Sequence, residues 1–330
     1  MSNVRYRIHS FALFIFAAAV TLVATRANAS ILFGTDFAGS YVSSNLGSPS
    51  GLPVPAGGLT LLAGDPNTLL IGGKANTIDG AIYSVALTRD AGGHITGFGG
   101  PATYYASAPF IDGGLAYGPG GVLFYTRYNT HQLGQIEPGS NVTDRVDNIL
   151  GFGAPGNSVG SLAFVPAGFG ANAGALKAVT YQQGNFGTIP LAPDGNGTFA
   201  PGSGTLDTIL SGGPEGIAYL AAGSPGFLNN SLLVAEYNNG AIAAYDIDAA
   251  ANPIPSSRRE FLTGLTGAEG AFIDPLTGDF LFSTFFAGSE VFVVRGFEPP
   301  AAVPEAAGIL VWLGLIGSAL WGRRRNAQKL

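Results

Sequence analysis

Three acidic residues occupy the same place in a recurring pattern and are the strongest candidates for chemistry. Asp112, Glu215 and Glu269 each come just before a short apolar segment that opens with glycine. Asn238 lies in a polar turn further along one of these units. Carboxylate and amide oxygens are the ligands that Ca²⁺ and Mg²⁺ prefer. A fold that brings the four side chains together would therefore create a divalent-cation site; in the alternative, each acid only caps a turn by accepting backbone hydrogen bonds.

The elements that must position these acids repeat along the chain. Units begin near residues 58, 114, 161, 216 and 270. Each unit has a small apolar segment, a strongly apolar one, a polar turn, a third apolar segment and a more polar fourth one. Glycine, proline and asparagine separate the segments, which is typical of short strands. Four strands in roughly 50 residues are the signature of a propeller blade.

We therefore predict an all-β chain with a β-propeller over residues 30–299. Five four-stranded units are clear, and six blades are allowed, because residues 31–37 and 40–44 form an extra hairpin candidate. This hairpin would either complete the last unit, which lacks a fourth strand, or form a partial blade. A β-sandwich or a β-helix is the alternative fold. The inner strands of a propeller begin at the channel mouth, so the three acids would converge there. The other two units have no acid at this position and have Ala56 and Ser158 nearby.

The units beginning at 114, 216 and 270 resemble NHL-type and gluconolactonase-like propeller repeats, and the segment Pro214–Tyr219 (PEGIAY) carries the closest likeness. The resemblance implies a divalent cation at the channel mouth, with Glu215 as the best single ligand. It also implies a metal-dependent lactonase-like hydrolase in which bound water is the nucleophile.

The N-terminal segment has the layout of a secretory signal peptide. Arg5 and Arg7 precede an apolar run over residues 11–23, and Ala27 and Ala29 form a small-residue cleavage site. We expect residues 1–29 to be removed. The alternative is an uncleaved membrane anchor.

The C-terminal segment has three parts: a linker over 300–305, an apolar stretch over 306–322 and a basic tail over 323–330. Sixteen apolar residues make a helix of roughly 24 Å, enough for a thin bilayer. Arg323, Arg324 and Arg325 would stay on the cytoplasmic side. We therefore predict a transmembrane helix with the propeller on the opposite side; the alternative is a plain anchor that is never processed.

Val303, Pro304 and Glu305, followed by the apolar stretch and the arginines, resemble a PEP-CTERM sorting signal. The resemblance implies export, recognition by an exosortase-type membrane peptidase, and a link to exopolysaccharide. The second proline of the motif is replaced by Ala306 in this sequence. We expect the protein to be anchored in the inner membrane facing the periplasm, and later to reach the cell surface or the extracellular matrix.

Composition narrows the function further. The chain has no cysteine and three histidines, and residues 30–304 contain 8 basic and 20 acidic residues. A nucleic-acid partner and a zinc site are therefore disfavoured. Six tyrosines either line a rim that stacks on sugar rings or pack between blades: Tyr104, Tyr105, Tyr125, Tyr128, Tyr181 and Tyr237. The leading prediction is a binding or structural component of the cell surface, with exopolysaccharide or surface proteins as partners. The alternative is the lactonase-like hydrolase, with Ca²⁺ or Mg²⁺ as its only expected cofactor.

Overall fold

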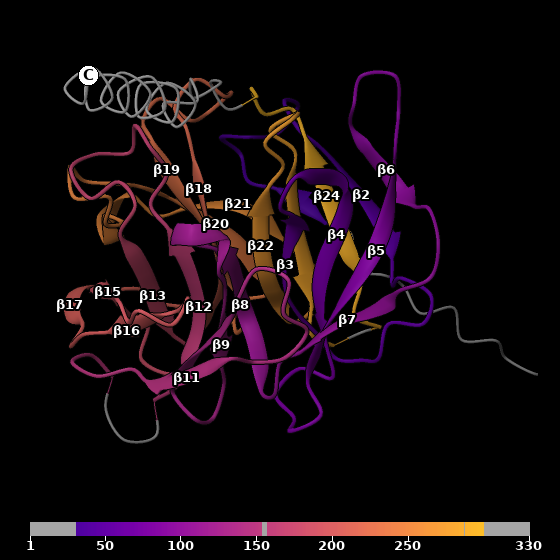
Figure 1. The fold of residues 1–330 in the computed structure, drawn as a ribbon. Helices are drawn as coiled ribbons and strands as arrows, with labels where there is room; N and C mark the ends of the chain where they lie inside the picture. Colours follow the sequence, from indigo (N-terminus) through magenta and orange to yellow (C-terminus); the bar gives the residue numbers. More distant parts are fainter. Residues whose placement is uncertain (1–30, 154–156, 287, 300–330) are drawn as a thin grey trace, which may run out of the picture. The chain divides into compact units, whose positions relative to one another are not determined.

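The computed structural model describes residues 31–299, apart from 154–156 and 287. Five antiparallel sheets follow one another along the chain, each with its first strand innermost (Figure 1). The first sheet contains β3 (Ala56–Leu62), β4 (Asp65–Gly73), β5 (Ala81–Arg89), β6 (Ile95–Phe98) and β7 (Thr103–Ser107). The second contains β8 (Ile111–Tyr117), β9 (Leu123–Arg127), β10 (Gln132–Ile136) and β11 (Arg145–Asn148).

The third sheet contains β12 (Val159–Phe164), β13 (Leu176–Thr180), β14 (Asn185–Ile189) and β17 (Thr205–Ile209). The fourth contains β18 (Pro214–Leu220), β19 (Ser231–Glu236), β20 (Ala241–Asp246) and β21 (Arg259–Thr263). The fifth contains β22 (Ala268–Ile273), β23 (Phe280–Thr284) and β24 (Val291–Arg295). A small hairpin of β15 (Leu191–Pro193) and β16 (Phe199–Pro201) is inserted in the third sheet. Two single-turn 3₁₀ helices, Pro119–Gly121 and Pro255–Ser257, lie in connecting loops.

The five sheets are the blades of a closed propeller. Strand β3 contacts β8, β8 contacts β12, β12 contacts β18, β18 contacts β22, and β22 contacts β3. This circular order confirms the predicted propeller with five blades and excludes six, the sandwich and the β-helix. The first strands begin at residues 56, 111, 159, 214 and 268, within three residues of the predicted unit starts.

The N-terminal strands close the ring, although not as a hairpin. Strand β2 (Val42–Gly47) pairs with β24 and supplies the missing fourth strand of the last blade. Strand β1 (Leu32–Phe33) pairs with β21 of the fourth blade instead of with β2. The predicted pairing of 31–37 with 40–44 is therefore wrong, because each segment gains a sheet edge with unpaired backbone groups.

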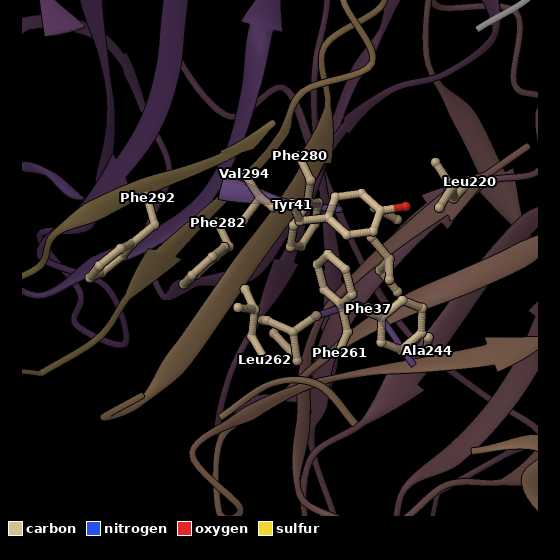
Figure 2. Packing of buried hydrophobic residues seen from close by; sticks show 14 of the residues in the cluster. Phe37, Tyr41, Leu220, Ala244, Phe261, Leu262, Phe280, Phe282, Phe292 and Val294 are labelled. Atoms are coloured by element: carbon tan, nitrogen blue, oxygen red, sulfur yellow. The ribbon is translucent and has the colours of Figure 1, made fainter. Parts of the chain in front are cut away.

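The hydrophobic core is divided into five clusters, one between each pair of neighbouring blades. Successive residues of a strand face different clusters: Leu232 and Val234 pack toward the third blade, and Leu233 toward the fifth. This two-sided burial explains why the second strands have nearly continuous apolar runs. The largest cluster, between the fourth and fifth blades, is completed by Phe37 and Tyr41 from the N-terminal segment (Figure 2).

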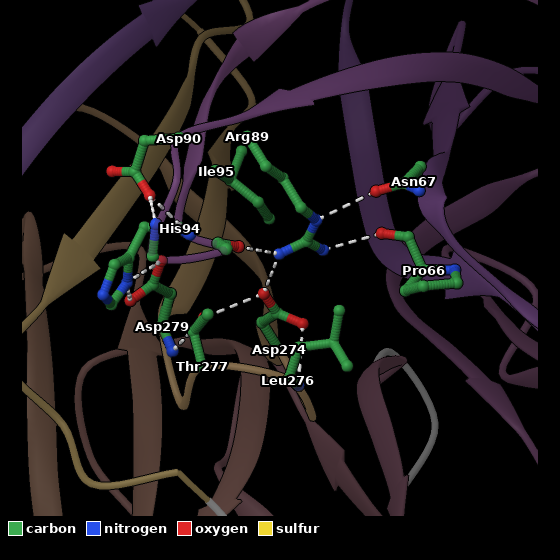
Figure 3. A network of polar contacts seen from close by, with 12 residues as sticks. Pro66, Asn67, Arg89, Asp90, His94, Ile95, Asp274, Leu276, Thr277 and Asp279 are labelled. Atoms are coloured by element: carbon green, nitrogen blue, oxygen red, sulfur yellow. Dashed lines mark hydrogen bonds and ion pairs between the residues drawn. The ribbon is translucent and has the colours of Figure 1, made fainter.

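Polar contacts tie the first blade to the last one. The Arg89 guanidinium donates to Asp274 Oδ2 of the last blade at 2.5 Å and is held within its own blade by a bond to the Pro66 carbonyl at 2.6 Å. His94 Nδ1 lies 2.8 Å from Asp279 Oδ1 (Figure 3). Asp274 and Asp279 are fully buried in the turn between β22 and β23. These contacts, which we call the blade 1–5 clasp, join the two blades at the seam of the ring.

Two predicted segments lie outside the described residues: the signal peptide with Ala27 and Ala29, and the sorting motif, apolar stretch and basic tail from 300 onward. Among the residues that are described, no helix is both long and apolar enough to cross a membrane.

Candidate metal site at the channel mouth

The three predicted acids meet at the start of the inner strands. Asp112, Glu215 and Glu269 each offer a carboxylate oxygen, and these oxygens lie within 4.8 Å of one another. All three residues are buried, with at most 4% of their surface exposed. The acids of β8, β18 and β22 therefore lie together at the starts of the inner strands.

A repeated irregularity in the blades places the carboxylates. The pairing of the first and second strands shifts register directly after Ile111, Pro214 and Ala268. The acid is the next residue in each case, so it belongs to a bulge that lies off the regular ladder, and bulges commonly re-aim a side chain. The same shift follows Ala56 and Val159 in the other two blades.

The positions equivalent to the acids in those two blades are Gly57 and Gly160, rather than Ala56 and Ser158 as the sequence indicated. Glycine is required here by space. A Cβ atom on Gly160 would lie 2.4 Å from Glu215 Oε2, so the Glu215 carboxylate occupies the volume that a side chain would need. A Cβ on Gly113 would similarly collide with the Glu215 carbonyl. Five inner strands can approach this closely only where glycine follows or replaces the acid.

Hydroxyl groups on the second strands hold neighbouring inner strands together. Thr126 Oγ1 accepts a hydrogen bond from the Gly114 N–H at 2.9 Å and donates to the Gly160 carbonyl at 2.8 Å. Ser283 makes the same pair of bonds at the seam, to Gly270 and Gly57. These bridges fix the backbone beneath the acids.

The carboxylates have little to compensate their burial. Both oxygens of Asp112, one of Glu215 and one of Glu269 are buried without a hydrogen-bond partner, and so is Asn76 Oδ1. Burial raises the pKa of Asp112 to about 8. Burial, and then repulsion from the neighbouring carboxylates, raises the pKa of Glu215 and Glu269 well above the usual range. Unpaired buried oxygens of this kind are costly unless a cation or protons neutralise them.

Asn238 does not join the acids. It is exposed, and its Oδ1 accepts a hydrogen bond from the Tyr181 hydroxyl at 2.9 Å. The amide that lines the cavity beside Glu215 and Glu269 is Asn76, which follows β4 with a left-handed backbone (φ 64°). Sequence reasoning missed Asn76, and the only available signal was its place in the loop after a second strand, where Asn238 also lies.

Aromatic side chains surround the entrance to the acids. Tyr128, Tyr181, Tyr237 and Phe285 are the first residues after the second strands of four blades, and with Asn76, Glu215 and Glu269 they line a cavity of about 300 Å³. Neighbouring rings meet edge to face at 5.7–6.3 Å between centroids. Of the predicted rim tyrosines, Tyr125 is instead fully buried between blades. The carboxylates contribute to raising the pKa of Tyr237 to about 12, after burial.

The described lining of this cavity contains no histidine, lysine or arginine. His94 belongs to the blade 1–5 clasp, and His131 is half-buried beside the Phe152 carbonyl, where burial lowers its pKa. The donor set is therefore three carboxylates and one amide oxygen. Such oxygens suit Ca²⁺ or Mg²⁺, and the cavity above them leaves room for water or a ligand at an open coordination position.

The sequence matches no described protein family, and no curated protein matches it. Among solved structures, the quinone-binding domain of pyranose dehydrogenase from Coprinopsis cinerea is similar to it (12% identity, 81% of this chain, 97% of that chain, TM-score 0.43). A glucose dehydrogenase (12% identity, 76% and 98%, TM-score 0.45) and a protein provisionally assigned as a gluconolactonase (16% identity, 79% and 83%, TM-score 0.39) are also similar.

Proposed function

We propose that the channel mouth is a divalent-cation site of a lactonase-like hydrolase. The observation that carries the proposal is the group of buried, unpartnered oxygens on Asp112, Glu215 and Glu269, two of which, Glu215 and Glu269, line an open cavity. A structural cation needs no such opening, whereas a catalytic one keeps a position for water or substrate. The chemistry that Ca²⁺ or Mg²⁺ would supply is polarisation of a carbonyl oxygen and activation of bound water.

The side chains of the site would have two roles, cation binding and ligand selection. Asp112, Glu215 and Glu269 would hold the cation, and the Asn76 amide oxygen would complete the set. The aromatic entrance formed by Tyr128, Tyr181, Tyr237 and Phe285 would exclude bulk water and limit the ligand to one small ring, given a cavity of about 300 Å³. The only basic groups near the reacting water would be the carboxylates themselves.

The quinone cofactor named for the pyranose dehydrogenase domain is not part of the proposal. Pyrroloquinoline quinone has three carboxylates, and the described lining presents Glu215 and Glu269 but no lysine or arginine to pair with them. The residues present do not fit that anion.

A second candidate is a binding component of the cell surface that uses the same cation site to hold a hydroxylated ligand. The absence of histidine and lysine from the described lining favours it, because no side chain there has an ordinary pKa near neutrality. Export, anchoring by 306–322, processing by an exosortase-type peptidase, and exopolysaccharide or surface proteins as partners complete this proposal.

Calorimetric titration of the full chain with Ca²⁺ and with Mg²⁺ tests the site. We expect saturable binding at one site, lost in Glu215→Gln and Glu269→Gln and kept in Glu260→Gln, whose side chain is exposed on β21. If no cation binds, or if binding is unchanged in Glu215→Gln and Glu269→Gln, both candidate functions lose the cation site on which they rest.

A lactone screen on the cation-loaded protein then separates the two candidates. Hydrolysis that follows cation occupancy supports the enzyme. Cation binding without hydrolysis, together with cation-dependent retention on a polysaccharide resin, supports the binding protein.

A further inference from the structure

The opposite end of the central channel opens into a second, larger cavity. Its volume is about 610 Å³, and every inner strand contributes a large apolar side chain near its last residue: Leu62, Tyr117, Phe164, Tyr219 and Phe272. We call this cavity the funnel. Its described lining contains one charged residue, Asp65, whose carboxylate accepts hydrogen bonds from Thr68 and from the Asn67 N–H. A concave apolar surface open to solvent at this scale marks a binding site.

The described chain ends beside the funnel. The Glu298 N–H donates to Ser224 Oγ in the loop between β18 and β19 at 3.0 Å. The Glu298 carbonyl lies against Gly278 in the turn between β22 and β23, and Pro275 of that same turn lines the funnel. Six residues, 300–305, then lead to the apolar stretch that begins at Ala306. Their extended reach is roughly 20 Å.

The loops around the funnel are acidic. Those that join the third and fourth strands, at 90–94, 137–144, 190–204 and 247–258, contain Asp90, Glu137, Asp144, Asp194 and Asp248. The one basic residue in them, Arg258, donates two hydrogen bonds to Glu236. Asp90 and Asp194 pair with arginines of neighbouring strands. Among the described residues, Glu137, Asp144 and Asp248 are the acids of these loops that have no salt bridge. An apolar hollow with an acidic surround complements an apolar segment followed by a basic cluster. Residues 306–321, followed by Arg323, Arg324, Arg325 and Lys329, have that composition.

We infer that, outside a bilayer, the C-terminal apolar segment of this chain docks one of its faces in the funnel of its own propeller. The described chain ends against the turn that lines the funnel, the funnel and the segment are both apolar, and the charges that flank them are opposite. Docking would cover apolar surface on both partners and would keep the chain monomeric before a membrane receives the segment. The inference is independent of the cation site, which lies at the other end of the channel.

The chain carries its own reporter for this contact. Its two tryptophans, Trp312 and Trp321, both lie in the apolar segment, and none lies in the propeller. Tryptophan emission from the full chain therefore reports on the segment alone. In detergent-free buffer we expect a monodisperse protein with blue-shifted emission and poor quenching by acrylamide.

Ala63→Arg places a positive charge on an exposed residue of the funnel wall. We expect a red shift of the emission and stronger quenching. Ser48→Arg is the matched control, because Ser48 is exposed after the end of β2 on the channel-mouth side and does not line the funnel. The emission of this variant should equal that of the unchanged protein. Circular dichroism checks that both variants keep the fold.

Disulfide trapping gives a second test that does not depend on emission. The chain has no cysteine, so Ala63→Cys combined with Leu313→Cys creates the only possible bond. An intramolecular disulfide supports docking. Aggregation of the unchanged chain, identical emission in all three proteins, or a blue shift that appears only with phosphatidylcholine vesicles would overturn it, the last result assigning the segment to the membrane.

Discussion

At the scale of single residues, the acids at the channel mouth determine how the metal-free protein responds to pH. Burial raises the pKa of Asp112 from its ordinary value of 3.8 to about 8. Between these values the unfolded chain has released the proton that the folded chain retains, so rising pH favours unfolding. This contribution to stability is fully present below the unfolded pKa and is lost as pH rises through about 8.

We therefore expect the melting temperature in chelator to fall as pH rises from about 5 to about 9. Asp112→Asn should flatten this dependence, while Asp36→Asn, at an exposed residue, should leave it unchanged. Added Ca²⁺ should restore the melting temperature at the alkaline end. Parallel profiles for the unchanged protein and Asp112→Asn would contradict the assignment.

Part of the channel-mouth site could be predicted from the sequence and part could not. The acids were predictable because each stands before glycine and an apolar strand in a repeated unit, and the repeat itself dictates convergence. Asn76 was not, because which loop residue turns inward depends on a left-handed backbone that no repeat encodes. The bulges were also missed, so Gly57 and Gly160 were not recognised as the equivalents of the acids.

At the scale of elements, the blade 1–5 clasp joins a β-hairpin of the first blade to a turn of the last one. Arg89 is 10% exposed and Asp274 is fully buried, so losing the guanidinium would leave a buried carboxylate without its cation. We expect Arg89→Ala to lower the free energy of unfolding by about 3–5 kcal/mol. Asp79→Ala, which removes a 3.6 Å surface pair with Lys74, should cost about 0–1 kcal/mol.

Urea unfolding of both variants measures the difference. Similar losses in the two would show that the clasp contributes no more than a surface pair. The clasp could not be predicted, because its partners are 185 residues apart and His94 carries no local signal. The pairing of β1 with the fourth blade could not be predicted for the same reason. The blades themselves could be predicted because they depend on the local alternation of apolar strands and turns.

At the scale of the whole molecule, the two terminal segments are predicted to direct export and sorting, whereas the propeller carries the candidate site. We expect neutral replacements of Arg323, Arg324 and Arg325 to change the orientation or the processing of the C-terminal segment in cells, because these charges would hold its end in the cytoplasm. Protease accessibility of a C-terminal tag measures the orientation, and replacing Arg145, on an outer strand, serves as the control. Unchanged orientation and processing would argue against a sorting signal.

The pairing of β2 with β24 has a consequence for synthesis. Residues 42–47 are made almost first, and their partners at 291–295 almost last, so the closing blade cannot assemble while the chain is still emerging. A contact of such long sequence separation is slow to form. The ring therefore closes only after β24 has been made, and the blades formed earlier lack their closing contact until then.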